Sequence, residues 1–257
     1  MSAAALTLHD LTVSYRGHPA VHHLSGAFPR GGLSAVVGPN GAGKSSLLGA
    51  LSGVFGGGLS GGPGAAVIAV QGRIERDAAM RVAYLPQAAS LDRSFPVRVH
   101  ELVAGGLWAQ TGSFGSVGPQ GATSASRALE AVGLAGFERR WLGELSAGQV
   151  QRALFARLLL QDAGLILLDE PFNAIDARTT AELLGLLKRW KQELRTVIAV
   201  LHDLDQVREH FDHTLLLARE AVAWGPTAQV LRAENLHQAR QMAEAWDDQA
   251  QRCERTA

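Results

Sequence analysis

The chain of 257 residues is long enough for one large α/β domain, and hydrophobic residues, at 47%, are sufficient to build a core. Its 24 basic and 24 acidic residues balance, so no strong positive field favours nucleic acid as a partner. Because Cys253 is the only cysteine and no run approaches the ~18 apolar residues of a membrane helix, we expect a cytoplasmic protein without disulfides or a cysteine-built zinc site.

The first elements along the chain are predicted to be β-strands. Several short strands are expected from about Leu6 to Phe28, where polar residues interrupt the apolar pattern before a Pro-Arg-Gly-Gly turn. Residues 32–37 then predict a buried strand, and residues 46–51 predict a helix. Residues 56–64 are too rich in glycine for a regular element, so we expect a surface loop leading to a strand at 65–70.

The segment between the buried strand and the helix matches the phosphate-binding pattern G-x-x-x-x-G-K-[ST]. Its glycines let successive backbone N–H groups approach phosphate oxygens, Lys44 supplies a positive charge, and Ser45 offers a hydroxyl to Mg²⁺. The strand before it and the helix after it favour this function over an ordinary glycine turn. We therefore predict a nucleotide site that includes Gly38, Pro39, Asn40, Gly41, Ala42, Gly43, Lys44 and Ser45.

From Val97 to about Gln161 the pattern becomes helical, with a glycine-rich break from Gly105 to Gly121 and an apolar-periodic segment from Ala125 to Val132. Near the end of this region, Ser146 and Gln149 have the spacing of a capping box ahead of an apolar-periodic run. The exposed N–H groups of such a helix start can hold an anion, although many capping boxes begin helices that bind nothing.

Strand patterns return at 165–168 and 196–201, separated by a predicted helix at 177–193, as a βαβ unit requires. Asp169 and Glu170 follow the first of these strands, at the end where ligands of open α/β sheets bind. For hydrolysis of a γ-phosphate, Asp169 suits the Mg²⁺ and Glu170 suits the attacking water. The alternative is that the two carboxylates only cap the next helix.

His202 follows the second of these strands and is expected at the same edge of the sheet as Glu170, although a lone histidine there is more often structural. Further on, residues 214–218 and 221–224 predict a hairpin ahead of Pro226 and a polar helical tail.

All these motifs, in this order, resemble the ABC ATPases, and the resemblance extends from Leu6 to Trp224. It implies an α/β fold: a P-loop NTPase core with a mainly parallel sheet, an N-terminal antiparallel β section and a helical insertion. The implied organisation is a single ABC ATPase domain at 5–226, with its core at 5–87 and 162–226 and the insertion at about 88–161. A helical tail of unassigned role follows at 227–257.

The resemblance also implies roles for single residues. Glu170, His202 and Gln87 are the expected catalytic residues, with His202 at the γ-phosphate and Gln87 at Mg²⁺ and the water. Tyr15 is expected to stack on adenine, and the alternative is an ordinary strand aromatic. Further ATP contacts are expected from Ser46, Ser146, Ala147, Gly148, Gln149 and Asp176, and Mg²⁺ ligands from Ser45, Gln87 and Asp169. Ala147 replaces the glycine that is usual at its position.

Members of this family pair head to tail, so the resemblance implies an ATP-dependent homodimer. Each ATP then lies between residues 38–45 of one copy and 146–149 of the other. It also implies a separate membrane permease, whose coupling helix docks beside Gln87, here against Leu91 to Leu102. The alternative is a plain junction between loop and helix, with Phe95 and Val97 in the core.

Four short segments, at 95–97, 169–172, 223–225 and 234–236, resemble the ATPases of bacterial zinc and manganese importers. This implies the ATP-hydrolysing motor of a zinc importer, bound to the inner face of the bacterial membrane through its permease. A periplasmic or surface metal-binding protein is then an indirect partner, and no nucleic acid is expected.

Several alternatives stay open. The cargo can be manganese, an iron chelate or another solute, and export is also conceivable. In a different class, a soluble, non-transport ABC ATPase commonly carries paired domains, long coiled coils or basic arms, which this chain lacks. His18, His22 and His23 suggest a metal site, but no visible carboxylate or cysteine completes it, so a solvated surface is expected.

Overall fold

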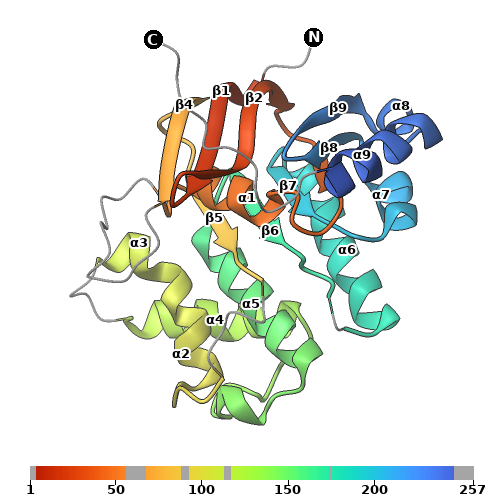
Figure 1. Ribbon diagram of the computed structural model, residues 1–257. Helices are drawn as coiled ribbons and strands as arrows, with labels where there is room; N and C mark the ends of the chain where they lie inside the picture. The colour runs from red at the N-terminus through yellow and green to blue at the C-terminus, as the bar shows by residue number, and fades with distance from the viewer. Residues whose placement is uncertain (1–3, 56–67, 88–92, 113–116, 174, 246–257) are drawn as a thin grey trace.

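The computed structural model describes residues 4–55, 68–87, 93–112, 117–173 and 175–245, which form two sheets and a set of helices (Figure 1). The smaller, antiparallel sheet has the order β2-β1-β4. Its strands are β1 (Ala4–Tyr15), β2 (His18–Pro29) and β4 (Ile68–Arg76). The larger sheet has the order β5-β6-β7-β3-β8-β9, in which only β8 and β9 pair antiparallel. Its strands are β3 (Leu33–Val37), β5 (Val82–Leu85), β6 (Leu165–Asp169), β7 (Thr196–Val200), β8 (His213–Ala218) and β9 (Glu220–Pro226).

Two long strands replace the several short ones predicted between Leu6 and Phe28. β1 and β2 each run for 12 residues, and their pairing contains register shifts, one of them between Leu8 and Leu11. Asp10, within that interval, adopts a left-handed backbone conformation with φ 51°. The polar interruptions are therefore bulges inside continuous strands, and the expectation of separate strands was wrong because a bulge shifts the apolar alternation without ending the pairing.

Apolar runs form the centre of the larger sheet, as the sequence predicts. All five residues of β3, β6 and β7 are buried, which is typical of parallel strands covered on both faces. The predicted hairpin is β8 and β9. Of the strand predicted at 65–70, residues 65–67 lie outside the described part, and β4 continues to Arg76 because it pairs with β1 as far as Leu6. The glycine-rich segment at 56–64 also lies outside the described residues.

Helices cover both faces of this sheet and form a group at its lower end in Figure 1, away from the antiparallel sheet. Around the core they are α1 (Lys44–Ser52), α6 (Ala177–Gln192), α7 (Leu204–His210), α8 (Thr227–Val230) and α9 (Ala233–Ala245). The lower group comprises α2 (Val99–Ala104), η2 (Gly105–Leu107), α3 (Trp108–Thr111), α4 (Pro119–Ala131), η3 (Leu142–Glu144) and α5 (Ala147–Gln161). Among the described residues, no helix is both long and apolar enough to cross a bilayer.

The glycine-rich break expected from Gly105 to Gly121 is largely helical, which corrects that expectation. η2, α3 and the start of α4 occupy it, and residues 113–116 lie outside the described part. Gly106 shows why glycine occurs here: a Cβ atom at this position would lie 2.4 Å from the carbonyl oxygen of Arg157 on α5. This glycine permits close helix packing rather than a turn.

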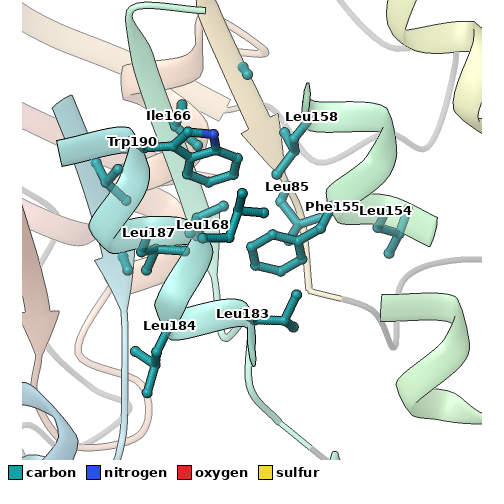
Figure 2. Close-up of a cluster of buried hydrophobic side chains, with 14 of the residues drawn as sticks. Leu85, Leu154, Phe155, Leu158, Ile166, Leu168, Leu183, Leu184, Leu187 and Trp190 are labelled. Carbon is teal, nitrogen blue, oxygen red and sulfur yellow. The ribbon is translucent and has the colours of Figure 1, made fainter. Parts of the chain in front are cut away.

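A stacked aromatic pair joins the lower helices to the sheet (Figure 2). Phe155 on α5 and Trp190 on α6 are nearly parallel, with ring centroids 6.0 Å apart and an interplanar angle of 8°. Around them, Figure 2 shows Leu85, Leu154, Leu158, Ile166, Leu168, Leu183, Leu184 and Leu187 from α5, α6 and the edge of the sheet. This core fixes α5, and with it the helix start at Ser146, against the sheet. The division into core, insertion and tail stays a prediction.

Replacing Trp190 with alanine is expected to lower the free energy of unfolding by about 3–5 kcal/mol, because the buried ring is lost and a cavity remains. Trp190 is 2% exposed, whereas Trp108 is 68% exposed, so Trp108→Ala is the matched control. The control is expected to change the free energy by less than about 0.5 kcal/mol. Urea unfolding followed by circular dichroism measures both variants, and equal losses would contradict the role assigned to this pair.

Candidate functional site

The predicted phosphate loop connects β3 to α1 and is held closely on both sides. A Cβ atom at Gly38 would lie 1.9 Å from the carbonyl oxygen of Leu217, and one at Gly43 would lie 2.1 Å from that of Ala20. Gly43 also has φ 90°, in the left-handed region that favours glycine. Only glycine fits these two positions, so the loop backbone is fixed between β8 and β2.

A residue of the β8–β9 turn ties the antiparallel sheet to this loop. The amide of Arg219 donates to the carbonyl of Ala42, 3.0 Å away, and its own carbonyl accepts from the amide of His22, at 2.8 Å. Arg219 has φ 64°, which turns its backbone to reach both partners. β2, the turn and the phosphate loop are thus one hydrogen-bonded unit.

Lys44 folds back over the loop from the first turn of α1. It is 6% exposed, and its ammonium donates to the carbonyls of Gly38 at 3.0 Å and Pro39 at 2.8 Å. Burial lowers the pKa of Lys44, while the negative charges of Glu170 and Asp169 act in the opposite direction. A desolvated ammonium held by carbonyls is well placed to exchange these partners for phosphate oxygens.

Asp169, the last residue of β6, has the properties of a metal ligand. It is 3% exposed, and within the described residues its Oδ1 atom has no hydrogen-bond partner. Burial raises the pKa of Asp169 despite a hydrogen bond from Ser45, and the nearby Glu170 adds to that rise. A buried carboxylate oxygen without a donor, beside a serine hydroxyl, fits the oxygen-ligand chemistry of Mg²⁺. Asp169 and Ser45 are therefore the residues that suit this ion.

Glu170 accepts three hydrogen bonds at the end of β6. His202 Nε2 lies 2.6 Å from its Oε1, and Gln87 Nε2 donates to its Oε2 at 2.7 Å. Asn173 donates to the same Oε2 atom at 3.1 Å. Glu170 has φ 49°, and its amide donates to the carbonyl of Val200 at 3.2 Å, which anchors it to β7. The three residues expected to be catalytic therefore lie together.

The pKa of Glu170 is lowered, although burial alone would raise it. Burial is the largest single effect, but the hydrogen bond and charge of His202, the hydrogen bond from Asn173 and the charge of Lys44 together outweigh it. The neighbouring carboxylates Asp169 and Glu170 are thus shifted in opposite directions. An ionised Glu170 can orient or deprotonate a water, and this role stays a prediction.

Asn173 is the site residue that sequence reasoning missed. It reaches Glu170 across the turn after β6, where the amide of Asn173 also donates to the carbonyl of Glu170 at 3.2 Å. The signal was present in the sequence, because an amide side chain stands three residues beyond a predicted catalytic carboxylate and Pro171 forces a turn between them.

Tyr15 lies at the end of β1, half-buried, with its ring edge-to-face on Phe55 at a centroid distance of 6.2 Å. Its stacking on adenine stays a prediction. Tyr84, on β5, lies near both this ring and Asp169, and burial raises the pKa of Tyr84 to about 12. Its phenol therefore stays protonated and adds no charge to the site.

The predicted capping box is present at the start of α5. Ser146 Oγ accepts from the amide of Gln149 at 3.3 Å, and Gln149 Oε1 accepts from the amide of Ser146 at 3.0 Å. Ala147 is exposed, so its methyl group, which the usual glycine lacks, does not displace neighbouring atoms of the same chain. Asp176, the N-cap of α6, lies beside this helix start: a Cβ atom at Gly148 would be 3.8 Å from its Oδ2 atom.

The segment predicted to dock a permease divides into exposed and packed residues. Leu91 lies outside the described part, Phe95 is 65% exposed, and Val97 packs against the core. The amide of Arg98 donates to Glu101 Oε2 at 2.7 Å, and its guanidinium lies 4.6 Å from the centroid of the Trp141 ring. Phe95 and Glu101 are exposed and Arg98 is half-buried, and the docking of a permease on this segment stays a prediction.

The candidate histidine cluster pairs with acidic side chains on the surface. His22 Nδ1 lies 3.0 Å from Glu220 Oε1, and His23 Nδ1 lies 2.5 Å from Asp10 Oδ1. Within the residues that the structure describes, no group of three or more histidine, cysteine, aspartate or glutamate side chains is arranged to hold a metal ion.

Comparisons with known proteins place these features in context. Residues 21–173 match the family model described as ABC transporter. The zinc transport system ATP-binding protein TroB of Treponema pallidum is 38% identical over 238 residues, which covers 93% of this chain and 87% of that protein. The manganese transport system ATP-binding protein MntB of Bacillus subtilis is 35% identical over 230 residues, covering 89% of each.

Among solved structures, a metal-chelate type ABC transporter in an inward-facing conformation aligns with a TM-score of 0.78 and 29% identity. The alignment covers 93% of this chain and 90% of that chain.

The contacts of Glu170 predict a pH effect. His202→Ala removes the bond and charge that lower the pKa of Glu170 and leaves burial, which raises it. Glu170 must be ionised to act as a base, so a raised pKa means that it becomes protonated earlier as the pH is lowered. The acid limb of the rate–pH profile for ATP hydrolysis is therefore expected to shift to higher pH. Single-turnover rates across the acidic range measure this shift.

Asn173→Ala is the matched variant, because Asn173 contributes less than His202 to the lowered pKa. Its acid limb is expected to move by a smaller amount in the same direction. An unmoved limb in His202→Ala, or equal shifts in both variants, would count against this account of the Glu170 carboxylate.

Proposed function

Because the chain belongs to the ABC transporter family, as an ATP-hydrolysing subunit, we propose that it is the motor of a metal-ion importer with zinc as the cargo. The observation that carries the ATPase mechanism is the position of Glu170, which is bound by His202, Gln87 and Asn173 within the electrostatic reach of Lys44. The metal cargo is supported by relatives named for zinc and manganese transport.

In the proposed mechanism, the loop at 38–45 binds the phosphates of ATP through its backbone N–H groups and Lys44. Mg²⁺, when bound by Ser45 and Asp169, offsets the negative charge of the phosphate oxygens. Glu170 orients or deprotonates the water, and Gln87 and His202 hold its carboxylate in place. By holding the Glu170 carboxylate, the Gln87 side-chain amide and the His202 imidazole fix the direction from which the water attacks.

We place the second half of each ATP site on another copy of the chain. The first N–H groups of a helix lack partners within it, and in α5 the capping box satisfies the one at Gln149. The others are available to an anion such as the γ-phosphate. A head-to-tail pair brings Ser146 and Gly148 of one copy to the Lys44 of the other, so ATP closes the dimer and hydrolysis opens it.

The motion must reach a membrane protein, and we assign the contact to the surface around Phe95. Its exposed ring lies between Gln87 and α2 in the sequence, so the contact is expected to respond to a change at the γ-phosphate. An exposed aromatic residue is a typical anchor of protein interfaces. The chain then resides on the inner face of the membrane through its permease.

Glu170→Gln is expected to give a lasting ATP-bound dimer, because a neutral amide cannot accept the proton of the attacking water while ATP still binds. Static light scattering at saturating Mg-ATP should report twice the monomer mass. Adding Ser146→Ala to this variant is expected to weaken the dimer, and Lys44→Ala is expected to abolish it. A persistent monomer of Glu170→Gln would contradict the head-to-tail arrangement.

The cargo is tested by growth of a deletion strain in chelator-treated medium, supplemented separately with zinc, manganese or iron. The intact gene is expected to restore growth with zinc, and Lys44→Ala is expected not to. Phe95→Asp should also fail to restore growth although the purified protein keeps its ATPase rate, because only the permease contact is lost. Rescue with manganese or iron alone would assign that cargo instead, and no metal phenotype would favour a non-transport ATPase.

A further inference from the structure

Arg152, in the second turn of α5, joins three helices through one guanidinium group. Its Nη1 atom donates to the carbonyl of Val132, the C-cap of α4, at 3.1 Å and lies 2.7 Å from Glu182 Oε2 on α6. Its Nη2 atom donates to Thr179 Oγ1, also on α6, at 3.0 Å. A Cβ atom at Gly133 would lie 2.8 Å from Nη1, so the chain leaves room for this group.

The hydroxyl of Thr179 passes this contact on to Asp176. Thr179 is 3% exposed, and its Oγ1 donates to Asp176 Oδ2 at 2.8 Å. A guanidinium has only hydrogen-bond donors, which fixes the direction of both bonds. Arg152 donates to the Thr179 hydroxyl, and the hydroxyl donates its single proton to Asp176. The amide of Thr179 also donates to Asp176 Oδ1 at 2.9 Å. Asp176 is thereby held at both oxygens.

Asp176 and the start of α5 form one continuous surface. A Cβ atom at Gly148 would lie 3.8 Å from both Asp176 Oδ2 and Ile175 Cγ2, which is van der Waals contact. Farther along the two helices, Phe155 and Trp190 stack between α5 and α6 (Figure 2). This contact joins the middle of α5 to the C-terminal end of α6, whereas Arg152 joins the two helices near the ends that carry Ser146 and Asp176.

We propose that Arg152 is a positioning residue that holds the helix start at Ser146–Gly148 and the Ile175–Asp176 turn in one orientation, so that both reach the partner copy's nucleotide together. This inference rests on the proposed head-to-tail closure. Arg152 contacts no nucleotide in this arrangement and acts through Thr179 and Asp176. Its loss therefore weakens dimer closure and turnover, while binding of ATP to the loop at 38–45 is unaffected.

Two conservative variants and one matched control test this role. Arg152→Lys keeps the charge opposite Glu182 but loses the fork that also reaches Thr179, and Thr179→Val removes the hydroxyl at nearly constant volume. Arg178→Lys is the control, because Arg178 also pairs with Glu182, at 3.2 Å, yet its side chain is 88% exposed and this partner lies on its own helix. The full-length chain is used throughout.

Arg152→Lys and Thr179→Val are each expected to lower kcat for ATP about tenfold, as for loss of one charge-assisted hydrogen bond, with nucleotide affinity of the monomer unchanged. The double variant is expected to lose no more than either single one, because both break the same chain of contacts. In the Glu170→Gln background, each should raise the Mg-ATP concentration needed for the dimer. Arg178→Lys should behave as the unmodified chain.

Rates and dimer formation like those of Arg178→Lys would overturn the proposal. So would losses of kcat that add in the double variant, or that only follow a lowered Tm, because a structural ion pair predicts both. Failure of the proposed function is a separate result: it appears as a lack of ATP-dependent dimer in Glu170→Gln with Arg152 intact.

Discussion

The parallel register of three buried strands is the constraint on which the site depends. Val36 of β3 lies opposite Val200 of β7, and Val200 lies opposite Asp169 of β6. The segments that follow these strands therefore begin at the same level of one sheet edge. They carry the phosphate loop, Glu170 and His202, and this explains how residues far apart in sequence meet within hydrogen-bond distance.

Neighbouring carboxylates have opposite environments at this edge. Asp169 is buried with an oxygen that lacks a donor among the described residues, and its pKa is raised, so a cation is the partner that stabilises its charge. Glu170 is surrounded by donors, and its pKa is lowered, so its charge persists without a metal. Two consecutive acidic residues thus have different environments, which suits the separate roles proposed for them.

The fold class and most of the predicted site could be read from the sequence, because strand-end position and loop pattern are local signals. The phosphate loop, Asp169, Glu170 and His202 all follow apolar runs that the structure makes into strands. Bulges near Asp10 and the helices around Gly106 were not foreseen, since they depend on pairing with β2 and on packing against α5. Arg152 was missed for the same reason, because its partners on α4 and α6 are set by tertiary contacts, whereas the local signal for Asn173 was present but not used.

The backbone hydrogen bonds of Arg219 link the two parts of the chain that are expected to bind one nucleotide. Because β2, the β8–β9 turn and Ala42 are hydrogen-bonded together, the antiparallel sheet that carries Tyr15 and the loop expected to receive the phosphates are joined through their backbones. A nucleotide that touches both is therefore expected to meet them in a defined relative position. The movement proposed for the transport cycle is then expected mainly between the two copies of the dimer, so nucleotide binding by the free chain and movement at the permease can vary separately.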